Sequence, residues 1–400
     1  MIGRRLVLSL CPFLVAATLV ACESGATPAK PAPASKPPAG SIDAGVAVVA
    51  GPTKPEAYTR LCAICHGPEA KGYAADHAPS LVTSTFLESA TDDFLFRSIA
   101  LGRPGTSMAA YSKAVNGPLD DATIREMIAW LRTKGPAVKP LLAVAPGDAK
   151  RGAEVYKIHC LSCHGDTAKR GEGISLANQQ FLQLATDSFM HHAIVHGRPG
   201  TKMEPWAGKI SDAQIADVIA YIRTDLSRTA PVAGQLPAPT GTEPLVINPK
   251  GKQPNFTLRS DPCLPTAPKC EPNKRYVSVE QVAAALKAKQ KMIIVDARPA
   301  SDWMRVHIPG AVSIPHHDPK RLDEIKNDGT FVIAYCACPH HLSGDIVDLL
   351  RKRGIQNSVI LDEGILEWHR RGYPVTAAEG VTPPPKQVDP NGDHAGHGHP

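Results

Sequence analysis

Two stretches of the chain repeat the same pattern of apolar residues at helical spacing. In residues 119–132 and again in residues 210–223, apolar side chains recur three and four positions apart. This spacing places them along one face of a helix. Asp120 and Ser211 are good N-cap residues where each helix would begin. The pattern predicts two similar amphipathic helices, whose apolar faces are Ile124, Met127, Ile128 and Leu131 in one and Ile215, Val218, Ile219 and Ile222 in the other.

After residue 276 the pattern changes to helices that alternate with short strands. Residues 279–288 and 344–353 have helical spacing, whereas short apolar runs occupy residues 292–296, 330–335 and 358–361. Strands separated by helices predict a parallel sheet with helices on both faces.

The chain begins with an apolar run, Leu6–Val20, that follows Arg4 and Arg5. A short basic start, an apolar core of this length and small residues after it predict a secretory signal over residues 1–21 rather than a spanning helix. Leu19-Val20-Ala21-Cys22 also resembles a bacterial lipobox, which implies cleavage before Cys22 and lipidation of its thiol. Ordinary cleavage nearby, with Cys22 as a bystander, is the alternative.

Three segments lack a sustained apolar pattern. Residues 22–51 are mostly Ala, Pro, Lys and Ser, and predict an extended tether that reaches roughly 90 Å at about 3 Å per residue. Residues 230–273 are rich in Pro, Gly and Thr and predict a linker. The composition of residues 379–400 predicts a disordered tail, in which His394, His397 and His399 can bind Zn or Cu weakly. Between these segments we expect folded domains at residues 52–138, 145–229 and 274–378.

The composition is that of a soluble globular protein with several domains. The 400 residues are 43% hydrophobic and 20% charged. The net charge of +6 is mild for this length, and no Lys/Arg run of the kind typical of nucleic-acid binding is present, so we expect no nucleic-acid surface.

The chain contains Cys-x-x-Cys-His twice, at Cys62–His66 and at Cys160–His164. This is the spacing of c-type haem attachment, in which two thiols bond the vinyl groups of one porphyrin and the His ligates the iron. One copy would also fit a redox or metal Cys-x-x-Cys followed by a chance His, but two copies in similar surroundings favour haem. We expect two covalent haem c groups, with thioethers at Cys62, Cys65, Cys160 and Cys163 and axial ligands at His66 and His164.

The sequence around the two motifs is duplicated as well. Tyr58 matches Tyr156, and Gly102-Arg-Pro-Gly-Thr-Ser-Met108 matches Gly197-Arg-Pro-Gly-Thr-Lys-Met203. Both units resemble class I cytochrome c domains, which are small all-α folds around one haem, and the resemblance covers nearly half the chain. It implies Met108 and Met203 as the distal iron ligands, and a neutral thioether ligand raises the reduction potential.

Two differences between the units bear on this prediction. The second unit offers other candidate ligands, His191, His192 and His196, at positions where the first has no His. The pair Gly152-Ala153 would let a helix approach closely, whereas the first unit has Lys54-Pro55, which predicts a shorter first helix there.

The last quarter of the chain resembles a rhodanese domain. The resemblance is carried by Asp296-Ala-Arg298, Trp303, His307-Ile-Pro-Gly-Ala311, Asp362-Glu-Gly364, Trp368, Gly372 and Pro374. In that family the residue after the central strand is a Cys that takes up a sulfane sulfur as a persulfide, and Cys336 matches it. Backbone N–H groups and a helix start pointing at a thiol favour the nucleophilic thiolate.

The loop from Cys336 to Gly344 departs from the common rhodanese form, because it has a second Cys and no Arg or Lys. Phosphatases that share the fold need an Arg five positions after the nucleophile, where this chain has His341, so we do not expect phosphatase activity. His340 or His341 would supply positive charge below about pH 6.5. Cys338 would either resolve a persulfide on Cys336 or form a strained disulfide with it. A domain used only for docking remains the alternative.

Two further cysteines, Cys263 and Cys270, flank a small loop in the Pro-rich linker. An oxidising exported compartment favours a disulfide between them. A surface metal site is the other interpretation, although no His lies nearby.

The sequence as a whole predicts a multidomain protein, with two all-α cytochrome c domains followed by an α/β rhodanese-like domain with a parallel sheet. We expect it in the periplasm, held to the membrane by a lipid anchor, with a redox protein and a small sulfur compound as partners. The first functional hypothesis couples persulfide chemistry at Cys336 to one-electron transfer through two haems. The alternatives are an electron carrier to a terminal oxidase or other redox partner with a docking domain, and sulfur transfer with incidental haems.

Overall fold

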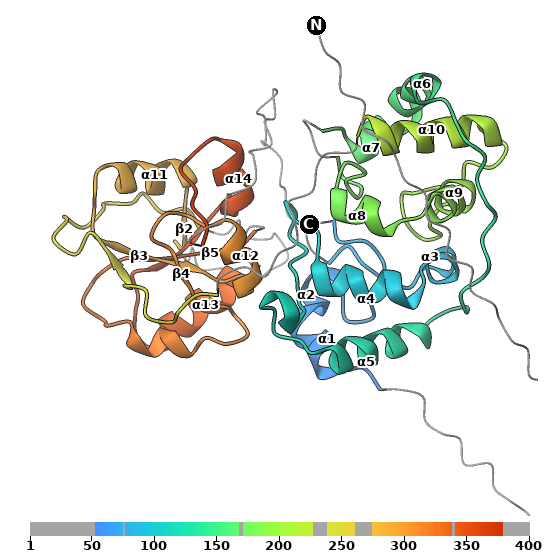
Figure 1. Cartoon of the computed structure of the whole chain (residues 1–400). Coiled ribbons are helices and arrows are strands. Elements are labelled where there is room, and N and C mark those ends of the chain that lie inside the picture. The colour runs from blue at the N-terminus through green and yellow to red at the C-terminus, as the bar shows by residue number, and fades with distance from the viewer. Residues whose placement is uncertain are drawn as a thin grey trace, which may run out of the picture. The chain divides into compact units, whose positions relative to one another are not determined.

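The computed structural model describes residues 53–74, 77–167, 171–226, 238–260, 274–337 and 341–378 (Figure 1). Predictions for residues 1–52, for the pair Cys263 and Cys270, for Cys338 and His340, and for the tail after residue 378 fall outside these ranges. Within the ranges, no helix has the length and apolar character needed to cross a bilayer.

The first haem-motif segment, residues 53–138, is helical. Its elements are α1 (Glu56–Leu61), α2 (Ala63–His66), α3 (Ser84–Ser89), α4 (Asp92–Leu101), the 3₁₀ turn η1 (Lys113–Val115) and α5 (Asp121–Arg132). Asp120 caps α5 as predicted, because its carboxylate accepts a hydrogen bond from the backbone N–H of Thr123 at 2.9 Å. The predicted apolar face is confirmed, since Ile124, Met127, Ile128 and Leu131 are all buried.

The second segment repeats this arrangement. Its elements are α6 (Ala149–His159), α7 (Leu161–His164), α8 (Gln179–Leu184), α9 (Asp187–His196) and α10 (Asp212–Thr224). Ser211 caps α10 in a complete capping box with Gln214. The segments differ most in their first helix, which has six residues in α1 and eleven in α6, as the difference between Lys54-Pro55 and Gly152-Ala153 predicts. A Cβ on Gly152 would lie 1.9 Å from the carbonyl oxygen of Asp217, so only glycine allows α6 to approach α10 this closely.

The two helical segments share one buried core. Phe94 of α4 and Phe189 of α9 stack with ring centroids 4.8 Å apart, and Phe86 of α3 meets Phe189 edge to face at 6.3 Å. The hydroxyl of Thr85 donates to the carbonyl oxygen of Gly197 at 2.7 Å, and the amide of Asn178 donates to that of Pro104 at 2.9 Å. Each segment therefore contacts the Met-containing loop of the other.

A six-stranded sheet organises the last third of the chain. Four strands follow the order β3 (Met292–Asp296), β5 (Val332–Tyr335), β6 (Ser358–Leu361) and β2 (Tyr276–Val277), all parallel, and β4 (Val312–Ser313) is parallel to β3. Alternate residues of the strands face opposite sides. One side packs on α13 (His341–Lys352) and η2 (Lys320–Glu324), and the other on α11 (Val279–Lys287) and α14 (Gly364–Arg370), while α12 (Ala300–Arg305) follows β3 (Figure 1).

The sequence pattern does not predict the short strands β2 and β4, and two further local features differ from the prediction. Val246–Ile247, inside the predicted linker, form strand β1 and pair antiparallel with β3, so the sheet is mostly rather than wholly parallel. A two-residue strand is too short for side-chain alternation to be visible in a sequence. The helix predicted to begin at residue 344 begins at His341, which brings it closer to Cys336.

Candidate functional site

Each Cys-x-x-Cys-His motif forms a short helical turn directly after a longer helix. Cys62 ends α1 and starts α2, and Cys160 ends α6 and starts α7, so the second thiol of each motif follows one turn later. Burial, reinforced by the neighbouring cysteine, raises the pKa of Cys62 to about 12 and that of Cys160 to about 11. Neutral thiols in apolar surroundings suit thioether bonds to a porphyrin better than a thiolate metal site.

The motif histidines are oriented in the same way in both segments. Nδ1 of His66 lies 2.9 Å from the carbonyl oxygen of Pro79, and Nδ1 of His164 lies 2.9 Å from that of Ile174. A carbonyl oxygen only accepts, so Nδ1 carries the hydrogen and Nε2 keeps its lone pair for iron. Burial lowers the pKa of both imidazoles, which favours the neutral form that ligates metals. The donor set therefore fits haem c.

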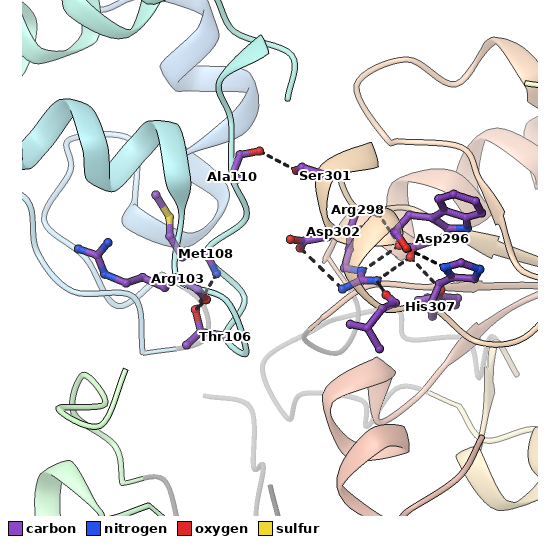
Figure 2. Close-up of polar contacts among 12 residues, drawn as sticks. Arg103, Thr106, Met108, Ala110, Asp296, Arg298, Ser301, Asp302 and His307 are labelled. Atoms are coloured by element: carbon purple, nitrogen blue, oxygen red, sulfur yellow. Dashed lines mark hydrogen bonds and ion pairs between the residues drawn. The ribbon is translucent and has the colours of Figure 1, made fainter. Parts of the chain in front are cut away.

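The two Met-containing loops are closed by matching hydrogen bonds. The backbone N–H of Arg103 donates to the carbonyl oxygen of Met108 at 2.7 Å, and that of Arg198 donates to Met203 at 2.6 Å. In the first loop the N–H of Met108 also donates to the hydroxyl oxygen of Thr106 at 3.1 Å (Figure 2). The second loop repeats this bond with its own Thr at the same distance. Each Met is thus presented by the same backbone geometry.

The alternative ligands on α9 face other partners. Nε2 of His192 lies 3.6 Å from the carboxylate of Glu88, its ring is 4.4 Å from that of His196, and His191 lies 3.9 Å from Asp212. Because Glu88 belongs to α3 of the first segment, His192 contributes to the contact between the segments. This geometry favours Met203 as the ligand, and the assignment of Met108 and Met203 stays a prediction.

Cys336 lies at the carboxyl end of β5, as predicted, and is 1% exposed. Its sulfur is 3.4 Å from the hydroxyl oxygen of Ser343 on α13, and its carbonyl oxygen accepts from the N–H of Ile365 at 3.0 Å. Gly364 has a φ of +68°, and a Cβ there would lie 2.9 Å from the carbonyl oxygens of Cys336 and Ala337. The start of α14 therefore needs glycine to pack against the Cys336 loop.

Charged groups around this loop include residues that the sequence did not single out. Burial raises the pKa of Asp345 on α13, while the nearby charges of His316 and His341 oppose the shift. Burial also lowers the pKa of His316, which follows β4. Ser343, Asp345 and His316 had no motif to mark them. A hydroxyl or carboxyl in the first turns of the helix that follows the nucleophile is the only sequence signal for Ser343 and Asp345.

Several motif residues of the α/β domain form a buried structural network. Arg298 and Asp296 make a bidentate ion pair, with nitrogen to oxygen distances of 2.7 and 2.9 Å, and the hydroxyl of Tyr335 donates to Asp296 at 2.8 Å. The rings of Trp303 and His307 stack with centroids 4.1 Å apart. These side chains stabilise the loop between β3 and β4, which gives the motif residues a role in the fold.

Comparison with known families agrees with this architecture. The model of the family "Cytochrome C oxidase, cbb3-type, subunit III" matches residues 53–131 and 147–222, and the model of the rhodanese-like domain matches residues 278–371. The chain therefore carries two c-type cytochrome segments and a C-terminal rhodanese-like domain. Cytochrome c segments of this kind imply covalently bound haem c.

Individual relatives match about two fifths of the chain. The Cbb3-type cytochrome c oxidase subunit CcoP of an Azospirillum species is 27% identical over 183 residues, which are 41% of this chain and 58% of the relative. The subunit FixP of Azorhizobium caulinodans is 28% identical over a match that covers 42% of this chain and 57% of the FixP chain. The chain thus spans a little over half the length of these relatives. For the C-terminal part, the solution structure of the rhodanese-like domain of the Anabaena protein Alr3790 is 23% identical, over 28% of this chain and 85% of that domain, with a TM-score of 0.25.

Proposed function

We propose that each helical segment binds one haem c and that the two haems exchange electrons with sulfur bound at Cys336. In the first segment Cys62 and Cys65 would form the thioethers, with His66 and Met108 as axial ligands. In the second, the corresponding residues are Cys160, Cys163, His164 and Met203. The duplicated His and Met geometry supports a count of two.

The sulfur step would proceed by transfer and then by redox exchange. The thiolate of Cys336 attacks the outer sulfur of a sulfane donor R–S–S⁻, the S–S bond of the donor breaks, and R–S⁻ leaves with no change in oxidation state. The resulting Cys336 persulfide takes up two electrons and one proton to give the thiolate and HS⁻, and the reverse reaction releases them. Two one-electron carriers match this two-electron couple.

One contact carries the proposal that the two chemistries are coupled. The hydroxyl of Ser301, on α12 of the rhodanese-like domain, donates to the carbonyl oxygen of Ala110 at 2.8 Å (Figure 2). Both residues are buried, and Ala110 lies two positions after Met108. This contact supports electron exchange between the rhodanese-like domain and the first haem. It favours this coupling over two domains that function independently of each other.

We further propose that the chain is exported, and that a lipid on Cys22 holds it at the periplasmic side of a membrane. A redox protein would then exchange electrons with the haems, and a small sulfur compound would reach Cys336. A signal-like start, the expected disulfide between Cys263 and Cys270 and the c-type haem motifs all fit export.

The coupling can be tested by anaerobic mixing of the oxidised protein with sulfide. We expect the absorption band of reduced haem to grow in the native chain, and to grow at least about tenfold more slowly in Cys336→Ser, because no persulfide can form. Ser301→Ala removes the hydrogen bond to Ala110 without changing the thiol and should give an intermediate rate. Equal rates in the native chain and Cys336→Ser would refute the coupled mechanism.

A second candidate function is an electron carrier in an oxidase assembly, with the rhodanese-like domain used for docking. The names of the relatives CcoP and FixP favour it, because both are subunits of a cbb3-type cytochrome c oxidase. Under this function, Cys336→Ser would leave both haem reduction and delivery of electrons to an oxidase unchanged.

A further inference from the structure

Two arginines occupy matching places where the cytochrome segments meet. Arg103 and Arg198 each follow the glycine that begins a Met-containing loop, five positions before the Met. The guanidinium of Arg103 donates to the hydroxyl oxygen of Ser98 at 2.9 Å and to the carbonyl oxygen of Gly102 at 3.1 Å. Figure 2 shows Arg103 beside Met108 on the same loop.

Both guanidinium groups lie between aromatic rings of the two segments. Arg103 is 5.9 Å from the ring centroid of Phe94 in its own segment and 5.8 Å from that of Phe181 in the other. For Arg198 the distances are 5.4 Å to Phe189 in its own segment and 5.7 Å to Phe86 in the other. The arrangement is therefore reciprocal, and each arginine belongs to the shared contact.

Neither arginine has an acidic partner among the residues that the structure describes. No carboxylate of that set lies within 4.0 Å of either guanidinium, whereas Arg132 and Arg223 on the C-terminal helices pair with Asp92 and Asp187. Burial alone lowers the pKa of Arg103 and of Arg198 to about 10. Aromatic faces compensate a partly buried cation only in part, so each guanidinium can still pair with an anion.

We propose that Arg103 and Arg198 are the counter-charges of haem propionate groups at the contact between the two cytochrome segments, and that they raise the reduction potentials of the haems. This inference rests on the proposed binding of one haem by each segment. A guanidinium presents a planar fork of N–H donors that matches a carboxylate. Each arginine lies on a loop that also carries a predicted iron ligand. Its positive charge is therefore close to the proposed haem site.

The sign of the effect follows from the charge of the iron. Ferric haem carries one more positive charge than ferrous haem, so a nearby guanidinium disfavours the ferric state. Removal of the guanidinium also leaves the propionate charge unbalanced, which favours the ferric state further. Removal of the guanidinium therefore lowers the reduction potential of the haem in both ways.

The test is a spectroelectrochemical titration of the full chain with Arg103→Gln and Arg198→Gln. We expect Arg103→Gln to lower the reduction potential of one haem and Arg198→Gln to lower that of the other. Each shift should be about 59 mV, which is a tenfold change in the equilibrium constant of a one-electron reduction. Arg103→Lys and Arg198→Lys keep the charge and should lie closer to the native values. Arg125→Gln is the matched control, because exposed Arg125 on α5 stacks on Phe96 at 4.8 Å and its loss should shift neither potential.

The outcomes separate this inference from the proposed function. Unchanged potentials in both Gln variants, or a shift in Arg125→Gln as large as theirs, would overturn the role of the two arginines while leaving sulfur-driven reduction of the haems intact. The titration uses chemical mediators and no sulfur compound, so a failure of the coupling to Cys336 would not affect it. If a Gln variant folds poorly, the Lys variants test the inference instead. A Lys variant keeps the positive charge, so a reduction potential well below the native value in Arg103→Lys or Arg198→Lys would contradict the inference.

Discussion

Replacement of Met108 by Ala is expected to lower the reduction potential of one haem by roughly 0.1 V or more, and Met203→Ala should do the same for the other. A thioether stabilises ferrous iron, and its loss leaves water or another ligand that favours the ferric state. Each variant should also remove about half of the ferric absorption that depends on a Met ligand. Redox titration and the ferric spectrum of the full chain measure both effects.

The histidines of α9 provide the control for this prediction. His192→Ala should leave both potentials and the ferric spectrum close to native, because His192 lies near Glu88 in the contact between the segments. An unchanged spectrum in Met203→Ala, together with an altered one in His192→Ala, would assign the second haem to histidine instead.

Replacement of Asp296 by Asn is expected to lower the free energy of unfolding of the rhodanese-like domain by about 3–5 kcal/mol, the cost of breaking a buried ion pair. Asp296 accepts hydrogen bonds from the side chain and backbone of Arg298 and from Tyr335, and it is fully buried. The change would leave the guanidinium of Arg298, 4% exposed, without its main counter-charge. Denaturant unfolding followed by the fluorescence of Trp303 and Trp368, with haem absorption as a separate probe, measures the loss.

Asp302→Asn is the matched control for this change. Asp302 lies 3.7 Å from Arg298, and burial raises its pKa, so its charge contributes less to the pair. We expect Asp302→Asn to lower the free energy of unfolding by less than Asp296→Asn does. Equal destabilisation by the two variants would contradict the assignment of Asp296 as the main partner.

The sequence predicts those parts of the fold that depend on near neighbours along the chain. The two haem motifs, the caps Asp120 and Ser211 and the apolar faces of α5 and α10 are local patterns, and the structure confirms the caps and the faces. The position of Cys336 at the end of a strand follows from the order of strand, loop and helix. The different lengths of α1 and α6 follow from the residues that replace one another at their starts.

Other features depend on residues that meet only after folding. Thr85 bonds to the loop at Gly197, which is 112 positions away, and the surroundings of Arg103 and Arg198 are made by rings from both segments. Strand β1 forms because β3 offers it an edge, and its two residues show no pattern of their own. The sequence indicated that these segments are related but held no signal for how they contact one another.

The most direct test of the central proposal counts electrons against sulfur. Oxidised protein is mixed anaerobically with a limiting amount of sulfide, the ferrous haem is measured by absorption, and the sulfur added to Cys336 is measured by mass spectrometry. The coupled mechanism predicts two ferrous haems for each sulfur atom gained, and neither product in Cys336→Ser. Haem reduction that is unchanged in Cys336→Ser, or sulfur gained on Cys336 with the haems still ferric, would contradict it.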